Sequence, residues 1–200
     1  MAKLYFSYAA MNAGKSTILL QASHNYRERG MRTLLLTAAL DDRAGTGVIA
    51  SRIGVCEQAL LFREGDDLYG TILDAHAEGH LHCIFIDEAQ FLTPDQVWQL
   101  ARVADRLKIP VMCYGLRTDF QGKLFPGSAE LLAIADSLRE IRTICACGAK
   151  ATMVVRQGPD GTPLVEGRQV DIGGNDKYIS LCRAHWEEKV GRWPGKGTRQ

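Results

Sequence analysis

The sequence predicts an α/β protein with a mainly parallel sheet covered by helices on both faces, followed by a small second unit. Over residues 3–143, short apolar runs alternate with stretches of helical periodicity, which is typical of parallel strands joined by helical crossovers. The first apolar run leads directly into a turn containing Gly14 and Lys15. From Cys145 onward the pattern changes to short extended runs separated by turns.

The first quarter of the chain contains three regular segments and one irregular segment. Lys3 to Tyr8 is rich in β-forming residues and predicts a strand. A helix is predicted from about Gly14 to Arg29, because apolar residues recur at helical spacing and a glycine follows. Arg32 to Ala38 is an apolar run that predicts a buried strand. Residues 41–55 contain three glycines without clean periodicity, so we expect a long loop that could fold over a ligand.

The next segments continue the alternation. A modest helix is predicted near Asp66 to Ala77, and the apolar run His82 to Ile86 predicts a strand that leads into two acidic residues. Thr93 is predicted to cap a helix that lasts to about Leu107, because Gln96 completes a capping box. The last segments of this part are a strand at Pro110–Tyr114, a helix at Ser128–Ala135 and a strand at Leu138–Thr143.

The domain organisation follows from the change of pattern near Cys145. We expect an α/β domain at residues 1–143, a second, smaller domain at residues 144–190 and a disordered tail at residues 191–200. Within the second unit, Pro159-Asp160-Gly161 is a plausible hairpin connection and Gly173-Gly174-Asn175 another turn.

Composition excludes several classes of function. Hydrophobic residues make up 46% and charged residues 24% of the 200 residues, and the net charge is +1. Nothing in this balance attracts nucleic acid or a membrane surface strongly. No segment has the length of a signal peptide core or a membrane span, so a cytoplasmic location is expected. The spread of the cysteines favours reduced thiols and one metal site over disulfides.

The turn after the first strand matches a P-loop, so the predicted sheet is of the P-loop NTPase type. The spacing Ala9-x4-Gly14-Lys15-Ser16 lies between a predicted strand and a predicted helix, as this motif requires. Lys15 would bridge the β- and γ-phosphate oxygens, and the Ser16 hydroxyl would hold Mg²⁺. Ala9 replaces the motif's first glycine, so its backbone must adopt angles that an ordinary residue tolerates. The alternative is a chance Gly-Lys-Ser at a helix start.

Two acidic residues follow the predicted strand at 82–86. Asp87 matches the carboxylate that holds magnesium beside a P-loop. Glu88 would stand at the carboxyl edge of the sheet, where open α/β folds bind ligands, and could serve as the base for an acceptor hydroxyl or water. The alternative is that both residues merely end a strand.

A closed zinc site is predicted in the second unit, which makes it a small C-terminal zinc-binding domain. Cys145, Cys147, Cys182 and His185 supply three thiolates and one imidazole, enough for tetrahedral Zn²⁺. The unit is too short to bury a strong apolar core alone, so a structural metal would help it fold. The chain must turn sharply after Cys147, and Gly148 allows that turn. The alternative is buried free thiols and a surface histidine.

These motifs together resemble the bacterial branch of the type II thymidine kinases. The similarity runs from about Lys3 to His185. It is carried by AMNAGKST at 10–17, DDR at 41–43, DEAQF at 87–91, YGLRTDFQGKLF at 114–125, and IGGNDKY followed by CRAH at 172–185.

The resemblance implies ATP-dependent transfer of the γ-phosphoryl group to the 5′-hydroxyl of thymidine, with deoxyuridine as a further acceptor. It also implies nucleotide salvage for DNA synthesis, feedback inhibition by dTTP, and a homotetramer with a structural zinc in each subunit. Glu88 matches the catalytic base. The ATP and phosphate positions are Ala9, Ala10, Met11, Asn12, Ala13, Gly14, Lys15, Ser16, Asp41, Asp42, Arg43, Asp87, Glu88, Ala89 and Gln90, with Mg²⁺ at Ser16 and Asp87. The thymidine positions are Met11, Phe91, Leu116, Phe120, Phe125, Val170, Asp171, Ile172, Gly173 and Tyr178, although each aromatic could instead pack in the core.

Two other functions fit parts of the sequence. A P-loop ATPase could carry a zinc ribbon that binds nucleic acid, but such a ribbon should show a basic stripe, and residues 145–200 are only mildly basic. A scaffold protein stabilised by zinc could bind a nucleotide without catalysing a reaction. Phosphate transfer to thymidine distinguishes the kinase from both.

Overall fold

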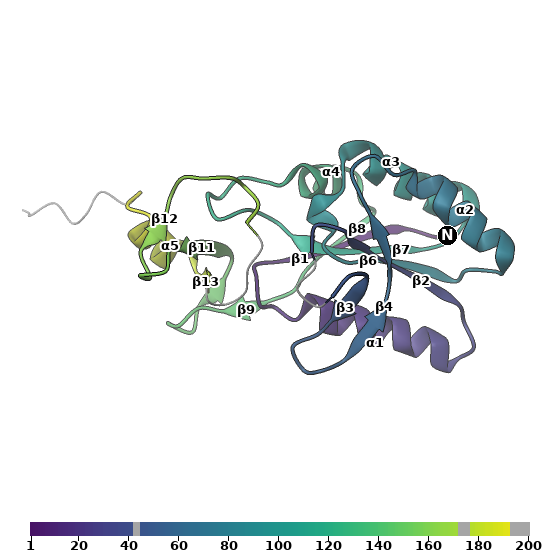
Figure 1. Ribbon diagram of the computed structural model, residues 1–200, viewed down its shortest axis with the longest axis horizontal. Helices are drawn as coiled ribbons and strands as arrows, with labels where there is room; N and C mark the ends of the chain where they lie inside the picture. Colours follow the sequence, from purple (N-terminus) through teal and green to yellow (C-terminus); the bar gives the residue numbers. More distant parts are fainter. Residues whose placement is uncertain (42–44, 172–176, 193–200) are drawn as a thin grey trace, which may run out of the picture.

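The central sheet has six strands, all parallel, in the order β5-β2-β6-β7-β1-β8. The computed structural model describes residues 1–41, 45–171 and 177–192 (Figure 1). The predicted parallel α/β sheet is confirmed, and its strands are β1 (Leu4–Ala9), β2 (Thr33–Ala38), β5 (Leu60–Phe62), β6 (Cys83–Ile86), β7 (Val111–Leu116) and β8 (Ser137–Glu140).

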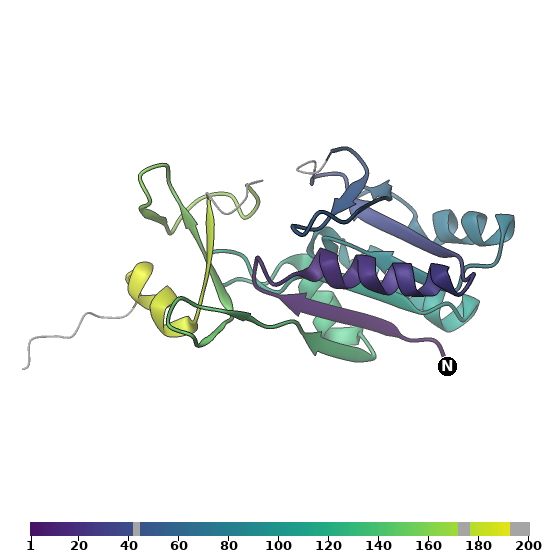
Figure 2. The same ribbon diagram turned by 90° about the horizontal axis from the view of Figure 1, so that it is seen from below.

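Helices cover both faces of this sheet, as predicted. One face carries α1 (Lys15–Glu28), which lies across the sheet in Figure 2. The other face carries α2, α3 and α4, which lie together along the upper side of Figure 1. Their bounds are α2 (Leu68–Glu78), α3 (Pro94–Arg102) and α4 (Pro126–Ile134). Among the described residues, no helix combines the length and apolar character that crossing a membrane requires.

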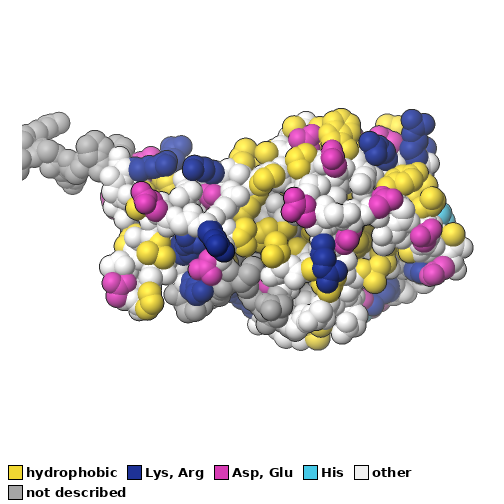
Figure 3. Space-filling model, turned by 45° about the horizontal axis from the view of Figure 1, so that its top comes forward, with side chains coloured by type: hydrophobic (Ala, Val, Ile, Leu, Met, Phe, Trp, Pro, Cys, Tyr) yellow, Lys and Arg dark blue, Asp and Glu magenta, His cyan; other side chains and the backbone are white. Residues whose placement is uncertain are grey.

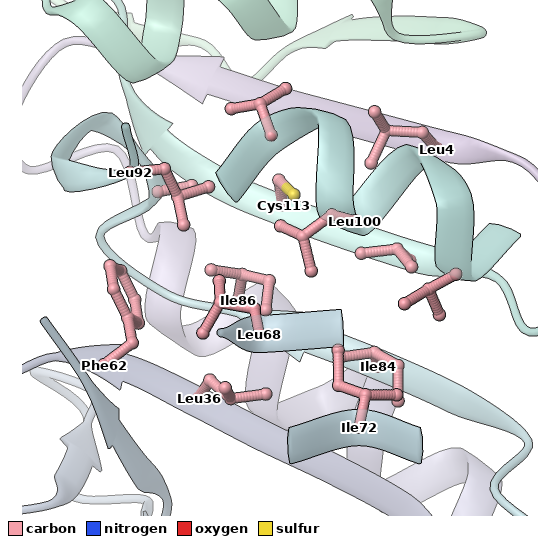
Figure 4. Close-up of a cluster of buried hydrophobic side chains, with 14 of the residues drawn as sticks. Leu4, Leu36, Phe62, Leu68, Ile72, Ile84, Ile86, Leu92, Leu100 and Cys113 are labelled. Atoms are coloured by element: carbon pink, nitrogen blue, oxygen red, sulfur yellow. The ribbon is translucent and has the colours of Figure 1, made fainter. Parts of the chain in front are cut away.

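The side chains of β6 show how one strand serves two cores. Ile84 and Ile86 point into the cluster under α2 and α3, where they meet Leu68 and Leu100 (Figure 4). Cys83 and Phe85 alternate with them and belong to the cluster under α1. A strand that is buried on both faces must be apolar at every position, as Cys83 to Ile86 is. The acidic residues Asp87 and Glu88, which follow this strand directly, therefore lie at the carboxyl edge of the sheet.

Residues 41–55 are more regular than the predicted loop. Val48–Ala50 (β3) and Cys56–Gln58 (β4) form an antiparallel hairpin, which is closed by a 2.7 Å bond from the Ser51 N–H to the Val55 carbonyl. Ile49 is buried against the cluster under α1. The expectation of an irregular segment is thus wrong for the hairpin, whose three-residue strands are too short to produce a visible period. Asp42 and Arg43 lie outside the described residues.

Two further boundaries differ from the prediction. The capping box at Thr93 and Gln96 is present, but the α-helix ends at Arg102 and continues as a π-helical turn, η2 (Val103–Leu107). The last strand of the first domain is predicted to reach Thr143, whereas β8 ends at Glu140. Thr143 and Ile144 form β9, which pairs with β10 (Lys150–Ala151) outside the central sheet.

The C-terminal elements form small antiparallel sheets with a core of their own. The larger sheet has the order β12-β11-β13, from β12 (Pro163–Leu164), β11 (Met153–Gln157) and β13 (Tyr178–Leu181). The predicted turn at Pro159-Asp160-Gly161 joins β11 to β12, with Gly161 at φ +79°. A helix that the sequence analysis did not predict, α5 (Arg183–Lys189), packs its Trp186 against Val155 and Leu181. The predicted turn at 173–175 and residues 193–200 of the predicted tail lie outside the described residues.

Candidate active site

The loop between β1 and α1 has the geometry that a phosphate loop needs. Ala9 is the last residue of β1 and keeps ordinary strand angles, so the absence of glycine there is tolerated. The left-handed positions are Asn12 (φ +65°) and Gly14 (φ +78°). They turn the chain into α1, whose first residue is Lys15. The Ser180 hydroxyl of β13 donates a 2.6 Å hydrogen bond to the Met11 carbonyl, so the C-terminal sheet contacts this loop directly.

Ser16 and Asp87 are joined across 71 positions of sequence. The Ser16 hydroxyl donates to Asp87 Oδ2 at 2.9 Å, which brings the start of α1 to the end of β6. Asp87 is buried, and burial is the main reason that the pKa of its carboxyl rises to about 7. The neighbouring negative charge of Glu88 raises this pKa further, whereas Ser16 and Lys15 lower it. A buried carboxylate and a hydroxyl at this distance form the oxygen pair that a divalent cation would complete.

Glu88 is held in an uncommon backbone conformation. Its φ is +51°, in the left-handed region that non-glycine residues seldom occupy and that often marks functional sites. Its Oε2 accepts a 2.5 Å hydrogen bond from Gln90 Nε2, and Gln90 Oε1 accepts from the Leu116 N–H at 2.9 Å. Gly115 makes room for this amide, because a Cβ there would lie 2.9 Å from Gln90. The carboxylate of Glu88 is therefore oriented by a side chain that is itself fixed to β7.

A cavity of about 600 Å³ opens beside these groups. It runs from the phosphate loop, past Asp87 and Glu88, to a wall of apolar and aromatic side chains that includes Phe120 and Tyr178. On the face drawn in Figure 3, hydrophobic side chains gather between the C-terminal elements and the central body. Polar groups for phosphates and apolar groups for a flat ring thus share one cavity.

The aromatic wall is built from both parts of the chain. Phe91 and Phe125 meet edge to face with ring centroids 6.0 Å apart at 79°. Tyr178 comes from β13, and its hydroxyl donates to the Asp171 carbonyl at 2.6 Å. The hydroxyl is thereby satisfied by the backbone, and the ring remains to contact a ligand.

The predicted metal ligands come together near the C-terminus. The ligand atoms of Cys145, Cys147, Cys182 and His185 all lie within 4.8 Å of one another. Gly148 adopts φ +81° and its N–H bonds to the Cys145 carbonyl at 2.8 Å, which makes the sharp turn that the close cysteine spacing demands. The hydrogen bond with His185 is the main cause that lowers the pKa of Cys145 to about 6. This donor set and spacing suit a closed tetrahedral site for a metal such as Zn²⁺.

Comparison with known proteins gives a consistent result. A sequence model of the thymidine kinase family matches residues 2–186. A thymidine kinase of Ruegeria pomeroyi is 64% identical over 197 residues, which cover 98% of this chain and 100% of the relative. The chain belongs to the thymidine kinase family. Another thymidine kinase, from Rhizobium meliloti, is 67% identical over 192 residues, covering 95% and 98% of the two chains. One from Photobacterium profundum is 58% identical over 192 residues, covering 96% and 100%.

Membership of the thymidine kinase family makes the chain a kinase. Most of the site residues that the resemblance implies line the cavity described above. They are Met11, Asn12, Ala13, Gly14, Lys15, Ser16, Asp41, Asp87, Glu88, Gln90, Phe91, Leu116, Phe120, Phe125, Val170, Asp171 and Tyr178. Ala9, Ala10 and Ala89 are buried beside the cavity and are not among its lining residues. Asp42, Arg43, Ile172 and Gly173 lie outside the described residues.

The cavity of this thymidine kinase family member has further walls, one of which, within the segment 41–55, the sequence predicted as a loop that could fold over a ligand. The β3–β4 hairpin contributes residues 48–53, and β11 contributes Val154. Asp119 and Gln169 line it as well, joined by a 2.9 Å bond from Gln169 Nε2 to Asp119 Oδ2. Asp119 stands within the motif at 114–125, which could have singled it out. Nothing local distinguishes Val154, since only the tertiary fold brings it to the cavity.

Proposed function

We propose that the chain transfers the γ-phosphoryl group of ATP to the 5′-hydroxyl of thymidine, giving dTMP and ADP. One observation carries the proposal: a single cavity is lined by the phosphate loop at one end, by aromatic side chains at the other, and by Glu88 between them. Donor and acceptor of a phosphoryl group must meet in line, so one continuous cavity is what the reaction needs.

The phosphate end suits a nucleoside triphosphate with Mg²⁺. Lys15 would neutralise the β- and γ-phosphate oxygens, and backbone N–H groups around Gly14 would face them. Ser16 and Asp87 would hold Mg²⁺ through their paired oxygens, 2.9 Å apart. A cation held by these two residues would supply charge stabilisation to the phosphate oxygens and to the leaving oxygen of ADP. Asp41 lines the same end of the cavity, and we propose that Asp42 and Arg43 contribute there too.

Glu88 would orient the acceptor hydroxyl. In a loose phosphoryl-transfer transition state, the hydroxyl proton leaves late, so aiming the oxygen at phosphorus is the main task of the base. The bond from Gln90 Nε2 to Glu88 Oε2 holds the carboxylate of Glu88 in a fixed orientation beside the cavity. This fixed orientation supports Glu88 as the catalytic base.

The aromatic end suits a pyrimidine nucleoside. Phe91, Phe120 and Phe125 offer apolar surface for a flat base, and Val170 and Asp171 lie on the backbone segment that would meet its polar edge. We propose from the resemblance that Ile172 and Gly173, which lie outside the described residues, also bind the base, and that deoxyuridine can occupy the same site. The family resemblance adds inhibition by dTTP, which would combine the nucleoside end with the phosphate end.

The cysteine and histidine cluster would hold a structural zinc ion. Cys145, Cys147, Cys182 and His185 supply four protein ligands, which would leave no position open for water. We propose that the metal stabilises a lid domain over residues 144–190, joined to an ATP-binding domain over residues 1–143. A homotetramer and a role in nucleotide salvage for DNA synthesis are proposed from the resemblance alone. The cytoplasmic location stays the prediction made from the sequence.

A single-turnover assay tests the function. Purified protein is mixed with γ-labelled ATP, Mg²⁺ and each of a panel of nucleosides, and labelled nucleoside monophosphate is measured. Transfer to thymidine should dominate, and Glu88→Gln should lower its rate by about 10²- to 10⁴-fold. The exposed Glu64→Gln serves as the matched control and should leave the rate unchanged. ATP hydrolysis that DNA stimulates, without nucleoside phosphorylation, would instead indicate an ATPase with a nucleic-acid-binding module.

A further inference from the structure

Arg156 is a buried cation that has no acidic partner among the residues that the structure describes. It lies in β11 and is 4% exposed, and no carboxylate of the described ranges forms an ion pair with it. Within the same ranges its Nε–H has no hydrogen-bond partner. Burying a guanidinium in this way is costly, and an apolar side chain of similar length would fill the space at lower cost. The contacts of its charged end therefore call for an explanation other than stability.

The first contact is with the aromatic ring of Phe120. The guanidinium carbon lies 3.8 Å from the ring centroid, a close cation–π stacking distance. Phe120 lines the cavity, whereas Arg156 is not among the lining residues. The cation thus stacks on the ring from outside the cavity. It holds the ring in place and draws electron density from it, which makes the cavity-facing side a better partner for a base that carries carbonyl oxygens.

The second contact is with the segment that leads to Val170 and Asp171. Arg156 Nη1 donates to the Arg168 carbonyl at 2.9 Å, and Nη2 donates to the Glu166 carbonyl at 3.4 Å. Gly167 lies between these carbonyls at φ +132°, and a Cβ there would come within 2.4 Å of Nη2. The turn is therefore shaped around the guanidinium. Two residues further on, the same segment becomes a wall of the cavity.

We infer that Arg156 is a positioning residue that sets nucleoside affinity by fixing Phe120 and the 166–171 segment together. The inference rests on the proposed function, because it concerns the nucleoside end of the same cavity. Lysine could supply the charge but not the planar fork that reaches two carbonyls while stacking on a ring. Methionine could supply the packing but neither the charge nor the hydrogen bonds.

Steady-state kinetics with thymidine and ATP test this role. Arg156→Met should raise KM for thymidine by roughly 30-fold, the loss expected for a desolvated cation–π contact with its hydrogen bonds. KM for ATP and kcat should change by less than about threefold, because the contacts of Arg156 with described residues are to Phe120 and to the carbonyls of Glu166 and Arg168. Arg156→Lys should give an intermediate KM. The control is Arg192→Met, since Arg192 also lies over an aromatic ring, 5.2 Å from Trp186, but is exposed.

A double-mutant cycle separates positioning from general loosening of the fold. If Arg156 acts through Phe120, then Arg156→Met should raise KM much less in a Phe120→Leu background than in the wild type, by a factor of about three or more. Melting temperatures of all variants are measured in parallel, since a purely structural defect would lower them without coupling to Phe120. Thymidine binding by calorimetry provides the same comparison without turnover.

Each outcome of these experiments supports or overturns the role inferred for Arg156. A wild type that does not phosphorylate thymidine overturns the proposed function and this inference with it. An active wild type with an unchanged thymidine KM in folded Arg156→Met overturns the inference alone. So does an equal rise of both KM values, or strict additivity with Phe120→Leu. If Arg156→Met does not fold, the two KM values and the coupling to Phe120→Leu are measured with Arg156→Lys instead, and they test the inference in the same way.

Discussion

The hydroxyl of Ser16 donates to the carboxylate of Asp87 at 2.9 Å, and this bond joins the first helix of the chain to the end of its central strand. Asp87 is 4% exposed, so the carboxylate is held in a place where its charge is poorly solvated. Such a group destabilises the protein without a cation and becomes favourable with one. We therefore expect the substitution Asp87→Asn to raise the stability of the metal-free protein and to lower its activity.

Asp87→Asn should make the metal-free protein more stable at pH 8 while abolishing most of its activity. Burial raises the pKa of Asp87 from 3.8 to about 7, so the folded protein keeps this proton to higher pH than the unfolded chain. Stability contributed by the protonated carboxyl is therefore present below about pH 4 and is lost as pH rises through about 7. Asparagine carries no charge at any of these pH values. We expect a gain of roughly 1–3 kcal/mol in unfolding free energy at pH 8, measured by denaturation in EDTA.

The gain from Asp87→Asn should vanish near pH 4, where the wild-type carboxyl is also neutral. Asp74→Asn, at an exposed position of α2, should show no gain at either pH. A stability difference between wild type and Asp87→Asn that stays constant from pH 4 to pH 8 would contradict this explanation.

Gln90→Leu should lower kcat more than it raises either KM. Gln90 is 1% exposed and joins Glu88 Oε2 to the Leu116 N–H, so leucine removes the hydrogen bond that orients the Glu88 carboxylate and removes the partner of the Leu116 N–H. We expect kcat to fall by about 10- to 100-fold and unfolding free energy by roughly 1–3 kcal/mol. The exposed Gln21→Leu is the control. A kcat that equals the wild-type value would show that Glu88 needs no such support.

Much of this site could be predicted because its residues adjoin strong local signals. Ser16 follows a glycine-lysine turn between a strand and a helix, and Asp87 follows a fully apolar strand, so their elements fix their places at one sheet edge. The capping box at Thr93 is likewise encoded in adjacent residues and is present. The family resemblance added the aromatic residues Phe91 and Phe125, which no local pattern separates from core residues.

The parts that could not be predicted depend on contacts distant in sequence. Val48–Ala50 and Leu60–Phe62 are three-residue strands, too short to show alternation, and only their partners make them regular. Arg156 lies in a mixed sequence where a charged residue is expected to be exposed, yet it is buried beneath Phe120, 36 positions earlier in the chain. Burial of a polar residue against a distant ring leaves no signature in one sequence.

Gly127→Ala should destabilise the protein severely, although alanine normally favours a helix. Gly127 is at the start of α4, and a Cβ there would lie 2.5 Å from the Leu92 carbonyl oxygen and 2.8 Å from that of Ala89. Both are backbone atoms, so α4 itself must shift away from η1 (Ala89–Phe91). We expect a loss of roughly 2–4 kcal/mol, measured by chemical denaturation.

A matched glycine makes the steric explanation of Gly127→Ala testable. A Cβ at Gly65 would meet no heavy atom of the described residues within 4 Å, and the φ of Gly65 is not left-handed. Gly65→Ala should therefore change unfolding free energy by less than about 1 kcal/mol. Because α4 packs on the segment that carries Glu88 and Gln90, the residual folded fraction of Gly127→Ala should also lose kcat. Equal stability of the two alanine variants would rule out the predicted clash.

Cys182→Ser should remove a metal ion and loosen the C-terminal elements without unfolding the central sheet. Cys182 Sγ lies 3.9 Å from Cys147 Sγ, and the residue is also the N-cap of α5, which carries Trp186. Trp186 Nε1 donates to the carbonyls of Val154 and Phe120, at 2.9 and 3.2 Å. Loosening α5 would therefore disturb two residues that line the cavity. We expect the bound zinc, measured by elemental analysis, to fall below about one tenth per chain, with KM for thymidine rising more than KM for ATP. Cys56→Ser, at an exposed cysteine outside the cluster, should keep both zinc and KM at wild-type values, and a full zinc content in Cys182→Ser would exclude this residue as a ligand.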